Sequence, residues 1–231
     1  MRAERRIMIQ TDPEIFKFLK EKLYVPVVSD VLDSLGYRNQ AMHHRLRPVL
    51  PDKRNCGLAG RARTLRWMEV DYINPEDPYG LELEAIDALR PGDVAVHSAD
   101  VGLTNAPWGE LMSTIAQRKG VAGCICDSLI RDVVRIIDMG FPVYCAGFKP
   151  VDSMGRGMVK AYDVPIRCGD VLVTPGQLVF ADFDGIVVIP QEIEQKVLEL
   201  AFEKVEKENL ARQDLINGES LCATYKKYGV L

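Results

Sequence analysis

The chain has 231 residues, of which 47% are hydrophobic and 27% charged, as in an ordinary globular protein. Its formal net charge of −4 argues against a nucleic-acid partner, because nucleic-acid binding usually shows as a basic excess. The sequence contains no run of about 18 apolar residues, so we expect no membrane span and no membrane partner. Its start turns polar and acidic before any apolar stretch long enough for a signal peptide, which predicts a cytoplasmic protein.

The six cysteines are spread along the chain except for one Cys-X-Cys pair, Cys124 and Cys126. There is no CxxC pair, and no histidine lies within a few residues of any cysteine. A zinc or disulfide role is therefore the weaker interpretation. We expect the cysteines to fill the core as small apolar residues. They are Cys56, Cys124, Cys126, Cys145, Cys168 and Cys222.

The first half of the chain alternates between helical and strand-like patterns. Residues 25–37 predict a helix that is capped by Ser29 and ended by Gly36, since glycine tolerates the left-handed conformation. The patterns that follow predict a strand, a turn-rich loop, a helix and, after a Pro-Gly turn, a second strand. In chain order these elements occupy residues 57–67, 72–80, 81–90 and 93–98.

The middle of the chain predicts βαβ units. A helix begins near Pro107, which suits a first turn, and stops at Gly120. A buried strand over 121–127, a helix over 130–140 and a strand over 141–147 follow. This order and spacing predict a partly parallel sheet. The apolar residues of the first helix fall at offsets 0, 3, 4, 7 and 8, on one helical face, and are Trp108, Leu111, Met112, Ile115 and Ala116.

The last part of the chain has a different texture. Residues 164–190 pack short β runs between Gly-Asp, Pro-Gly and Asp-Gly turns, which predicts hairpins. Residues 191–216 are helical and heavily charged. Because no linker, repeat or low-complexity segment interrupts the sequence, we expect one domain over residues 1–231. Its fold class is α/β, with an added antiparallel layer and a C-terminal helix.

The start of the helix after Pro107 is a candidate anion site. A helix N-terminus offers unpaired N–H groups and a partial positive charge. Here the amides are those of Gly109, Glu110, Leu111 and Met112, and the glycine would let a ligand approach the backbone closely. The alternative is that Gly109 merely fits the turn, and the spacing alone does not decide between the two.

The pair Arg131-Asp132 follows an apolar strand, and ligands of open α/β sheets collect beyond the carboxyl ends of strands. Arginine offers a fork of donors suited to a carboxylate. Aspartate offers hard oxygens suited to Mg²⁺ or Mn²⁺, which keep several waters and take only one or two carboxylates. Such sparse ligation fits a chain whose histidines (His43, His44, His97) form no metal-binding pattern. The alternative is that both residues are surface charges in the first turn of the next helix.

Four stretches resemble a known family: "SDVLDSLG" with "LAGRART", then "WGELMSTIAQRKGVAGCICDSLIRD", "GFPVYCAG" and "PGQLVFADFDGIVVIP". In this order they are similar to the RraA-like family, from about residue 25 to the C-terminus. That family includes the class II pyruvate aldolase that acts on 4-hydroxy-4-methyl-2-oxoglutarate. The resemblance implies an α/β/β sandwich, like that of swivelling phosphohistidine domains. It also implies a homotrimer or homohexamer with sites at subunit interfaces.

The resemblance also implies residue roles. The backbone amides of Gly109, Glu110, Leu111 and Met112 would hold the carboxylate of a small 2-oxo acid. Arg131 would bind its 2-oxo oxygen. Asp132 would hold Mg²⁺ or Mn²⁺, and Glu110 would help order water bound to that metal. The implied enzyme is a lyase that cleaves a 4-hydroxy-2-oxo acid to pyruvate, with oxaloacetate decarboxylation as a side activity.

This chain departs from the family pattern next to the Arg-Asp pair. Many members carry Gly-Ala/Cys-Val there, whereas this chain has Ser128, Leu129 and Ile130. Leu129 and Ile130 predict a less polar pocket, which would favour smaller or more apolar products.

Three features leave alternatives open. Some shorter members of the family are non-catalytic and bind and inhibit an RNA-degrading enzyme, which is the rival function. Glu206 or Glu208 on the charged C-terminal helix could reach a neighbouring subunit's site, although a solvated helix face is the simpler interpretation. Another candidate is a basic cluster that could bind a second carboxylate or RNA, or could be surface charge on a strand edge. This cluster consists of Arg61, Arg63 and Arg66.

Overall fold

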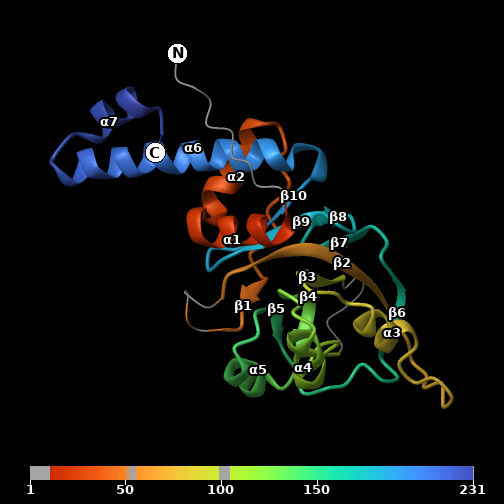
Figure 1. Ribbon diagram of the computed structural model, residues 1–231. Helices are drawn as coiled ribbons and strands as arrows, with labels where there is room; N and C mark the ends of the chain where they lie inside the picture. The colour runs from red at the N-terminus through yellow and green to blue at the C-terminus, as the bar shows by residue number, and fades with distance from the viewer. Residues whose placement is uncertain (1–10, 51, 53–55, 99–104, 231) are drawn as a thin grey trace.

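The computed structural model describes residues 11–50, 52, 56–98 and 105–230 (Figure 1). The helices are α1 (Asp12–Lys22), α2 (Val25–Ser34), α3 (Leu81–Asp87), α4 (Glu110–Arg118), α5 (Val133–Met139), α6 (Glu194–Ile216) and α7 (Leu221–Tyr228), with a 3-10 turn η1 (Gln191–Ile193). The strands are β1 (Arg47–Pro48), β2 (Leu58–Glu69), β3 (Asp93–Ser98), β4 (Gly123–Ile130), β5 (Val143–Phe148), β6 (Gly157–Tyr162), β7 (Ile166–Cys168), β8 (Val171–Val173), β9 (Leu178–Ala181) and β10 (Ile186–Ile189).

The main sheet is mixed and has the order β1-β5-β4-β3-β2-β9-β10, with β6 also paired to β2. The neighbouring pairs β2–β3, β3–β4 and β4–β5 are parallel, which confirms the predicted βαβ units. The long strand β2 pairs with β9 near its start and with β6 near its end. A register shift between Arg66 and Trp67 separates the pairing of β6 into two parts. This division curls the sheet, because a bulge bends a strand and increases its twist.

Alternation along the parallel strands divides the core into layers. In β4, Cys124 and Cys126 face the cluster that packs under α4 and α5, while Ile125 faces the opposite cluster with the β7–β8 hairpin. Helices α1, α2 and α6 pack against the β9–β10 end of the sheet (Figure 1). The result is the predicted α/β/β arrangement. Five of the six cysteines are buried and all six are free, so core filling is confirmed except at the exposed Cys222.

Two details of the predicted helices are wrong. Helix α2 begins at Val25 after Tyr24, so Ser29 lies inside the helix and caps nothing. Pro26 occupies the first turn instead, where its missing N–H would have had no intrahelical partner. The predicted end is confirmed, because Gly36 has a φ of +88°.

Helix α4 also begins later than predicted, at Glu110, and Pro107 therefore precedes the helix. Leu111 does not join the buried face and is 78% exposed, because it lies on the outer side of the first turn. The stop at Gly120 is confirmed, with a φ of +75°.

Strand β4 is longer than predicted. It runs to Ile130, so Arg131 follows it directly and not after a loop. A register shift between Cys126 and Leu129 interrupts the pairing with β5, which resumes at Leu129 and Ile130. The polar residues in this stretch made the strand look finished at Asp127, although Asp127 is buried and accepts hydrogen bonds from the Arg45 guanidinium.

The predicted hairpins are confirmed as β7–β8 and β9–β10. The β7–β8 turn has positive φ at both Gly169 (53°) and Asp170 (67°), the backbone that two-residue hairpin turns favour. No helix among the described residues is long and apolar enough to cross a membrane.

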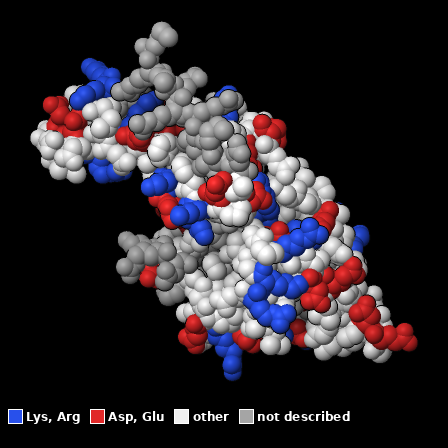
Figure 2. All heavy atoms as spheres, viewed as in Figure 1, with Lys and Arg blue, Asp and Glu red and all other residues white. Residues whose placement is uncertain are grey.

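The basic cluster is not on a strand edge, because β2 is paired on both sides. Arg61 forms ion pairs with Asp12 and Glu194, and Arg63 forms one with Asp163. Figure 2 shows basic and acidic side chains lying next to one another over the described part of this face. Arg61 and Arg63 thus tie β2 to neighbouring elements.

His97 at the end region of β3 is a buried imidazole. It is 1% exposed, its Nδ1 accepts a hydrogen bond of 3.0 Å from the Trp67 indole, and the ring of Trp108 meets it edge-on at 5.2 Å. Burial lowers the pKa of His97 to about 3. The His97 imidazole is therefore neutral in the folded protein.

We expect His97 to make the protein sensitive to acid. Its pKa is lowered from 6.5 to about 3 on folding, so its stabilising contribution is present above pH 6.5 and is lost as the pH falls towards 3. Between pH 6 and pH 4 the free energy of unfolding should fall by about 1.4 kcal/mol per pH unit more than in His97→Gln. Urea denaturation across this range measures the difference. The exposed His44→Gln serves as control, and equal slopes in all three proteins would contradict the expectation.

Candidate active site

Trp108 fixes the start of helix α4. Its side chain is fully buried and stacks on Phe141 with a centroid distance of 6.3 Å. Its indole N–H donates to Ser113 Oγ at 2.8 Å, and Ser113 Oγ in turn donates to the Gly109 carbonyl at 3.0 Å. The large buried ring therefore holds the first turn of α4 through both packing and hydrogen bonds.

The same residue joins α4 to the end of β4. Trp108 and Ile130 form a parallel bridge, in which the Arg131 N–H donates to the Trp108 carbonyl at 3.0 Å. Two residues beyond the bridged pair in each segment, the Glu110 N–H donates to Asp132 Oδ2 at 3.2 Å. The structure therefore brings together the helix start and the Arg131-Asp132 pair, as the sequence predicted.

Asp132 has a backbone conformation that non-glycine residues seldom adopt. Its φ of 59° and ψ of 30° lie in the left-handed region, which costs energy for a residue with a Cβ. This conformation turns its carboxylate back towards the first turn of α4. The side chain is 42% exposed, so the carboxylate remains accessible to a ligand.

Gly109 is required by a close approach. A Cβ at this position would lie 2.8 Å from Asp132 Oδ2, 3.2 Å from Arg131 Cγ and 3.4 Å from Arg131 Nε. The Arg131 stem and the Asp132 carboxylate therefore both rest against the bare backbone of Gly109. This favours the interpretation of Gly109 as a site residue over the one in which it merely fits a turn.

The predicted four-amide anion cradle needs a correction at Glu110. The first intrahelical bond of α4 is from Ser113 N to the Gly109 carbonyl, so the preceding amides have no acceptor within the helix. The amide of Glu110 is already donated to Asp132. The amides of Leu111 and Met112 belong to the same first turn and likewise precede the first intrahelical bond.

A cavity of about 320 Å³ opens beside the pair. Ile130 forms part of its wall, as the sequence suggested, whereas Leu129 packs near Gly147. The Arg131 side chain is 35% exposed, so its guanidinium can reach both protein and ligand groups. The residues lining the cavity are Ile130, Arg131, Asp132, Val133, Phe148, Lys149 and Pro150, so the predicted residues 109–112 lie beside Asp132 but do not line it.

Sequence reasoning missed a second acidic partner of Arg131. Arg131 Nη2 lies 3.4 Å from Asp152 Oδ1 and Arg131 Nε lies 3.8 Å from Asp132 Oδ2, so the guanidinium bridges two carboxylates. Asp152 accepts hydrogen bonds from the Tyr79 hydroxyl at 3.1 Å and from the Ser153 N–H at 2.8 Å. The loop that holds Asp152 carries no motif, and only its three-dimensional position shows its role.

Behind this loop lies Glu82 on α3. It is fully buried, and burial raises its pKa to about 8 against the opposing effect of a 3.2 Å hydrogen bond from Ser153 Oγ. Its other oxygen, Oε1, has no hydrogen-bond partner among the described residues. Glu82 is therefore neutral at pH 7, because an ionised carboxylate could not be satisfied there.

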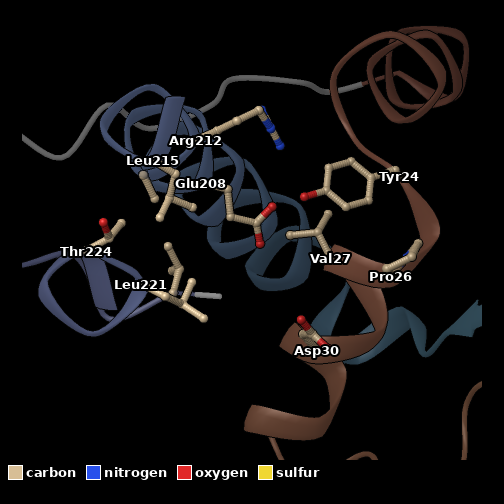
Figure 3. Close-up of a pocket in the computed structure, with 11 residues that line it drawn as sticks. Tyr24, Pro26, Val27, Asp30, Glu208, Arg212, Leu215, Leu221 and Thr224 are labelled. Carbon is tan, nitrogen blue, oxygen red and sulfur yellow. The ribbon is translucent and has the colours of Figure 1, made fainter. Parts of the chain in front are cut away.

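The C-terminal acids do not join the site of their own chain. Glu206 and Glu208 lie on α6, which packs on α2 away from α4 and α5 (Figure 1). Glu208 points into a different cavity, of about 350 Å³, between α2, α6 and α7 (Figure 3). There burial raises its pKa, and Lys204 Nζ lies 3.9 Å away. A contribution to a neighbouring subunit stays a prediction.

The residues present fit a sparsely ligated hard cation. Among the described residues no three acids, histidines or cysteines gather as a metal-binding group. Asp132 offers an accessible carboxylate beside the helix start, and Mg²⁺ often takes one or two protein carboxylates. Glu110 is an acid of the adjoining first turn, and its Oε1 accepts a 2.9 Å hydrogen bond from Thr114 Oγ1.

Comparison with known proteins identifies the family. The model of the RraA-like family, described as Aldolase/RraA, matches residues 25–188. The chain belongs to this family. A Halalkalibacterium halodurans protein with the provisional name 4-hydroxy-4-methyl-2-oxoglutarate aldolase is 32% identical over 77% of this chain and 77% of its own. A similarly named Ectopseudomonas mendocina protein is 31% identical over 52% of this chain and 74% of its own.

Solved structures of RraA proteins share the fold. Streptomyces coelicolor RraAS2, described as an unusual member of the RNase ES inhibitor RraA protein family, superposes with a TM-score of 0.75. It is 30% identical, and the match covers 88% of this chain and 98% of that one. The mixed α/β fold with its curled sheet is therefore that of RraA-like proteins.

We expect Gly109→Ala to disturb the site without a change elsewhere. The new methyl group would overlap Asp132 Oδ2 and crowd Arg131, which should lower the free energy of unfolding by about 1 kcal/mol or more. Gly57→Ala is the matched control, since the nearest atom to its Cβ would be the Ala181 carbonyl oxygen at 3.8 Å. That variant should match or slightly exceed the wild type, by up to about 1 kcal/mol. Equal stability of the two variants in urea denaturation would contradict the close approach.

Proposed function

We propose that the protein is a divalent-metal-dependent lyase that cleaves a 4-hydroxy-2-oxo acid, such as 4-hydroxy-4-methyl-2-oxoglutarate, to pyruvate and a second oxo compound. The observation that supports this most is the 3.2 Å hydrogen bond from Glu110 N to Asp132, which ties the first turn of α4 to a cavity lined by Arg131 and Asp132. It holds the helix start beside a guanidinium and an accessible carboxylate. The names of two relatives point to the same chemistry.

The chain's own residues account for binding and charge stabilisation. The amides of Leu111 and Met112 bind the substrate carboxylate at the positive end of α4. Loss of the proton from the 4-hydroxyl, through water to the Glu110 carboxylate, drives formation of the new carbonyl. The C3–C4 bond breaks, and its electron pair forms the enolate of pyruvate. Arg131 stabilises the negative enolate oxygen where charge develops, and C3 then takes up a proton.

Mg²⁺ or Mn²⁺ held by Asp132 would supply Lewis-acid polarisation of the 2-oxo group. Loss of CO₂ from oxaloacetate leaves the same enolate, so the same residues would support decarboxylation as a side activity. Arg131 would again meet the developing negative oxygen, which is why one site can serve both reactions.

Pyruvate release from 4-hydroxy-4-methyl-2-oxoglutarate tests the proposal. We expect turnover with Mg²⁺ or Mn²⁺ and none after thorough chelation with EDTA. Arg131→Ala should lower kcat by on the order of 10²–10³, the usual effect of losing one donor to a developing oxyanion. Arg135→Ala, an exposed arginine on α5, is the matched control and should be near normal. Full activity in EDTA, or a normal rate for Arg131→Ala, would end this proposal.

A protein-binding function is the second candidate, because RraAS2 matches nearly its whole length. Under that alternative the chain would bind and inhibit an RNA-degrading enzyme and would release no pyruvate. The two functions separate in one pair of assays: turnover of the oxo acid with and without metal, and RNA cleavage by an RNase E-type enzyme with and without this protein.

We also propose that the protein works as a trimer or hexamer with sites between subunits. Three large apolar side chains flank the site and face outwards: Leu111 is 78%, Val134 71% and Phe148 61% exposed. Exposed apolar residues that cluster around a polar site are typical of a surface covered by another chain.

Val134→Glu should disrupt that assembly. A charge at the centre of an apolar contact cannot be solvated once the contact closes, whereas in a single chain the position is open to water. We expect light scattering to show a smaller species with unchanged helix content and lower activity. Lys17→Glu, an exposed charge change on α1, should leave the mass unchanged. A single-chain mass for the wild type would refute the assembly proposal.

A further inference from the structure

We propose that Asp152, held by Tyr79 and backed by the buried Glu82, is a positioning residue that sets the location of the Arg131 guanidinium in the oxo-acid site. This inference rests on the proposed function of that site and adds three residues from outside the family motifs. They belong to the loop before α3, to α3 itself and to the loop after β5.

Arg131 needs a second anchor when Asp132 holds a cation. The Arg131 guanidinium lies between two carboxylates, with Nε 3.8 Å from Asp132 and Nη2 3.4 Å from Asp152. A cation held by Asp132 would compete with the guanidinium for that carboxylate. Asp152 would then be the partner that keeps Arg131 in place, since a long side chain loses considerable rotamer freedom when it is fixed.

Asp152 can act as an anchor because it is itself fixed. Its two oxygens accept from Tyr79 and from the Ser153 amide, and its side chain is 26% exposed. Its loop is tied to the segment that enters α4, where the Ala106 N–H donates to the Val151 carbonyl at 2.9 Å. The anchor and the helix start are therefore parts of one hydrogen-bonded unit.

The neutral state of Glu82 limits the negative charge around Arg131, which favours the binding of an anion. Ser153 links it to Asp152 through one amide and one hydroxyl bond. Among the described residues, the charges that shift the pKa of Glu82 are those of Asp152 and Arg131. Asp152 and Glu82 both raise the pKa of Tyr79. A neutral Glu82 leaves Asp132 and Asp152 as the two negative charges beside Arg131. An ionised Glu82 would add a third and oppose the binding of an anion.

Binding of oxalate, a planar analogue of the pyruvate enolate, tests the positioning role without turnover. Calorimetry with and without Mg²⁺ should show that Asp152→Ala weakens oxalate binding by roughly tenfold or more, the size expected when a charged hydrogen bond loses its geometry. Asp152→Asn keeps the acceptor for Arg131 and Ser153 and should stay within about threefold of the wild type. Tyr79→Phe should lie between them. Tyr162→Phe, which removes a similar tyrosine–carboxylate bond from Glu84 on α3, is the matched control.

The outcomes distinguish a failure of the positioning role of Asp152 from a failure of the proposed function. If the wild type binds oxalate and Asp152→Ala binds it equally well, the positioning role is wrong and the proposed function stands. Tighter binding by both Asp152 variants would show that Asp152 only competes with the ligand. If the wild type binds neither oxalate nor pyruvate, the proposed function itself fails. Should Asp152→Ala not fold, the Tyr79→Phe and Tyr162→Phe comparison decides.

A pH series gives a readout that a purely structural role would not move. Glu82 gains its charge as the pH rises through about 8, so the dissociation constant of oxalate should rise between pH 7 and pH 9 by roughly threefold or more. Glu82→Gln has the neutral shape at every pH and should not show this rise. The same rise in both proteins would exclude Glu82 as the cause of the pH dependence.

Discussion

The candidate site depends on one backbone contact, the hydrogen bond from the Arg131 amide to the Trp108 carbonyl. It continues the parallel pairing of the sheet by one bridge and so brings a helix start to the end of β4. Trp108 makes the contact rigid because its ring is fully buried and its indole is hydrogen bonded. The Glu110 amide follows Trp108 in the chain, and the Asp132 carboxylate follows Arg131. The contact therefore sets the positions of both groups. Without this bridge the two halves of the site would belong to separate loops.

Charge balance is the second constraint, because one guanidinium serves two carboxylates in a partly buried setting. Arg131 is fixed by Asp132 and Asp152, and its stem rests on the bare backbone of Gly109. Asp132 and Asp152 together offset Arg131 and Lys149, a second cation that lines the cavity, so the site has no excess positive charge for a 2-oxo acid unless a divalent cation is also present. The geometry and the expected requirement for a divalent metal therefore support each other. The neutral state of Glu82 belongs to the same balance, since a further charge would weaken anion binding.

The sequence predicted those parts that depend on short-range patterns. Apolar patterns located α4 and β3, turn residues located the hairpins, and Gly120 and Gly36 ended helices where expected. It failed at Asp127, because a register shift lets β4 continue past polar residues that looked like its end. It also missed Asp152 and Glu82, whose partner residues are far away in the chain: Ser153 and Glu82 are separated by 71 positions. No local pattern can announce a contact that only the folded loops create.

The fold alone does not decide between an enzyme and a protein-binding regulator, since the family model and the solved relatives carry both descriptions. Local energetics are more informative. Asp132 adopts a left-handed backbone that costs energy, and Glu82 is buried with one oxygen lacking a partner among the described residues. Neither feature stabilises the fold, and a surface that only contacted another protein would need neither. Asp132 follows Arg131 directly, and Glu82 interacts with the Arg131 charge from behind the loop that holds Asp152. Similar features occur elsewhere among the described residues, such as the left-handed Asp170 and the buried His97, but here two of them lie around one guanidinium, as expected if a ligand and its ion complete the site.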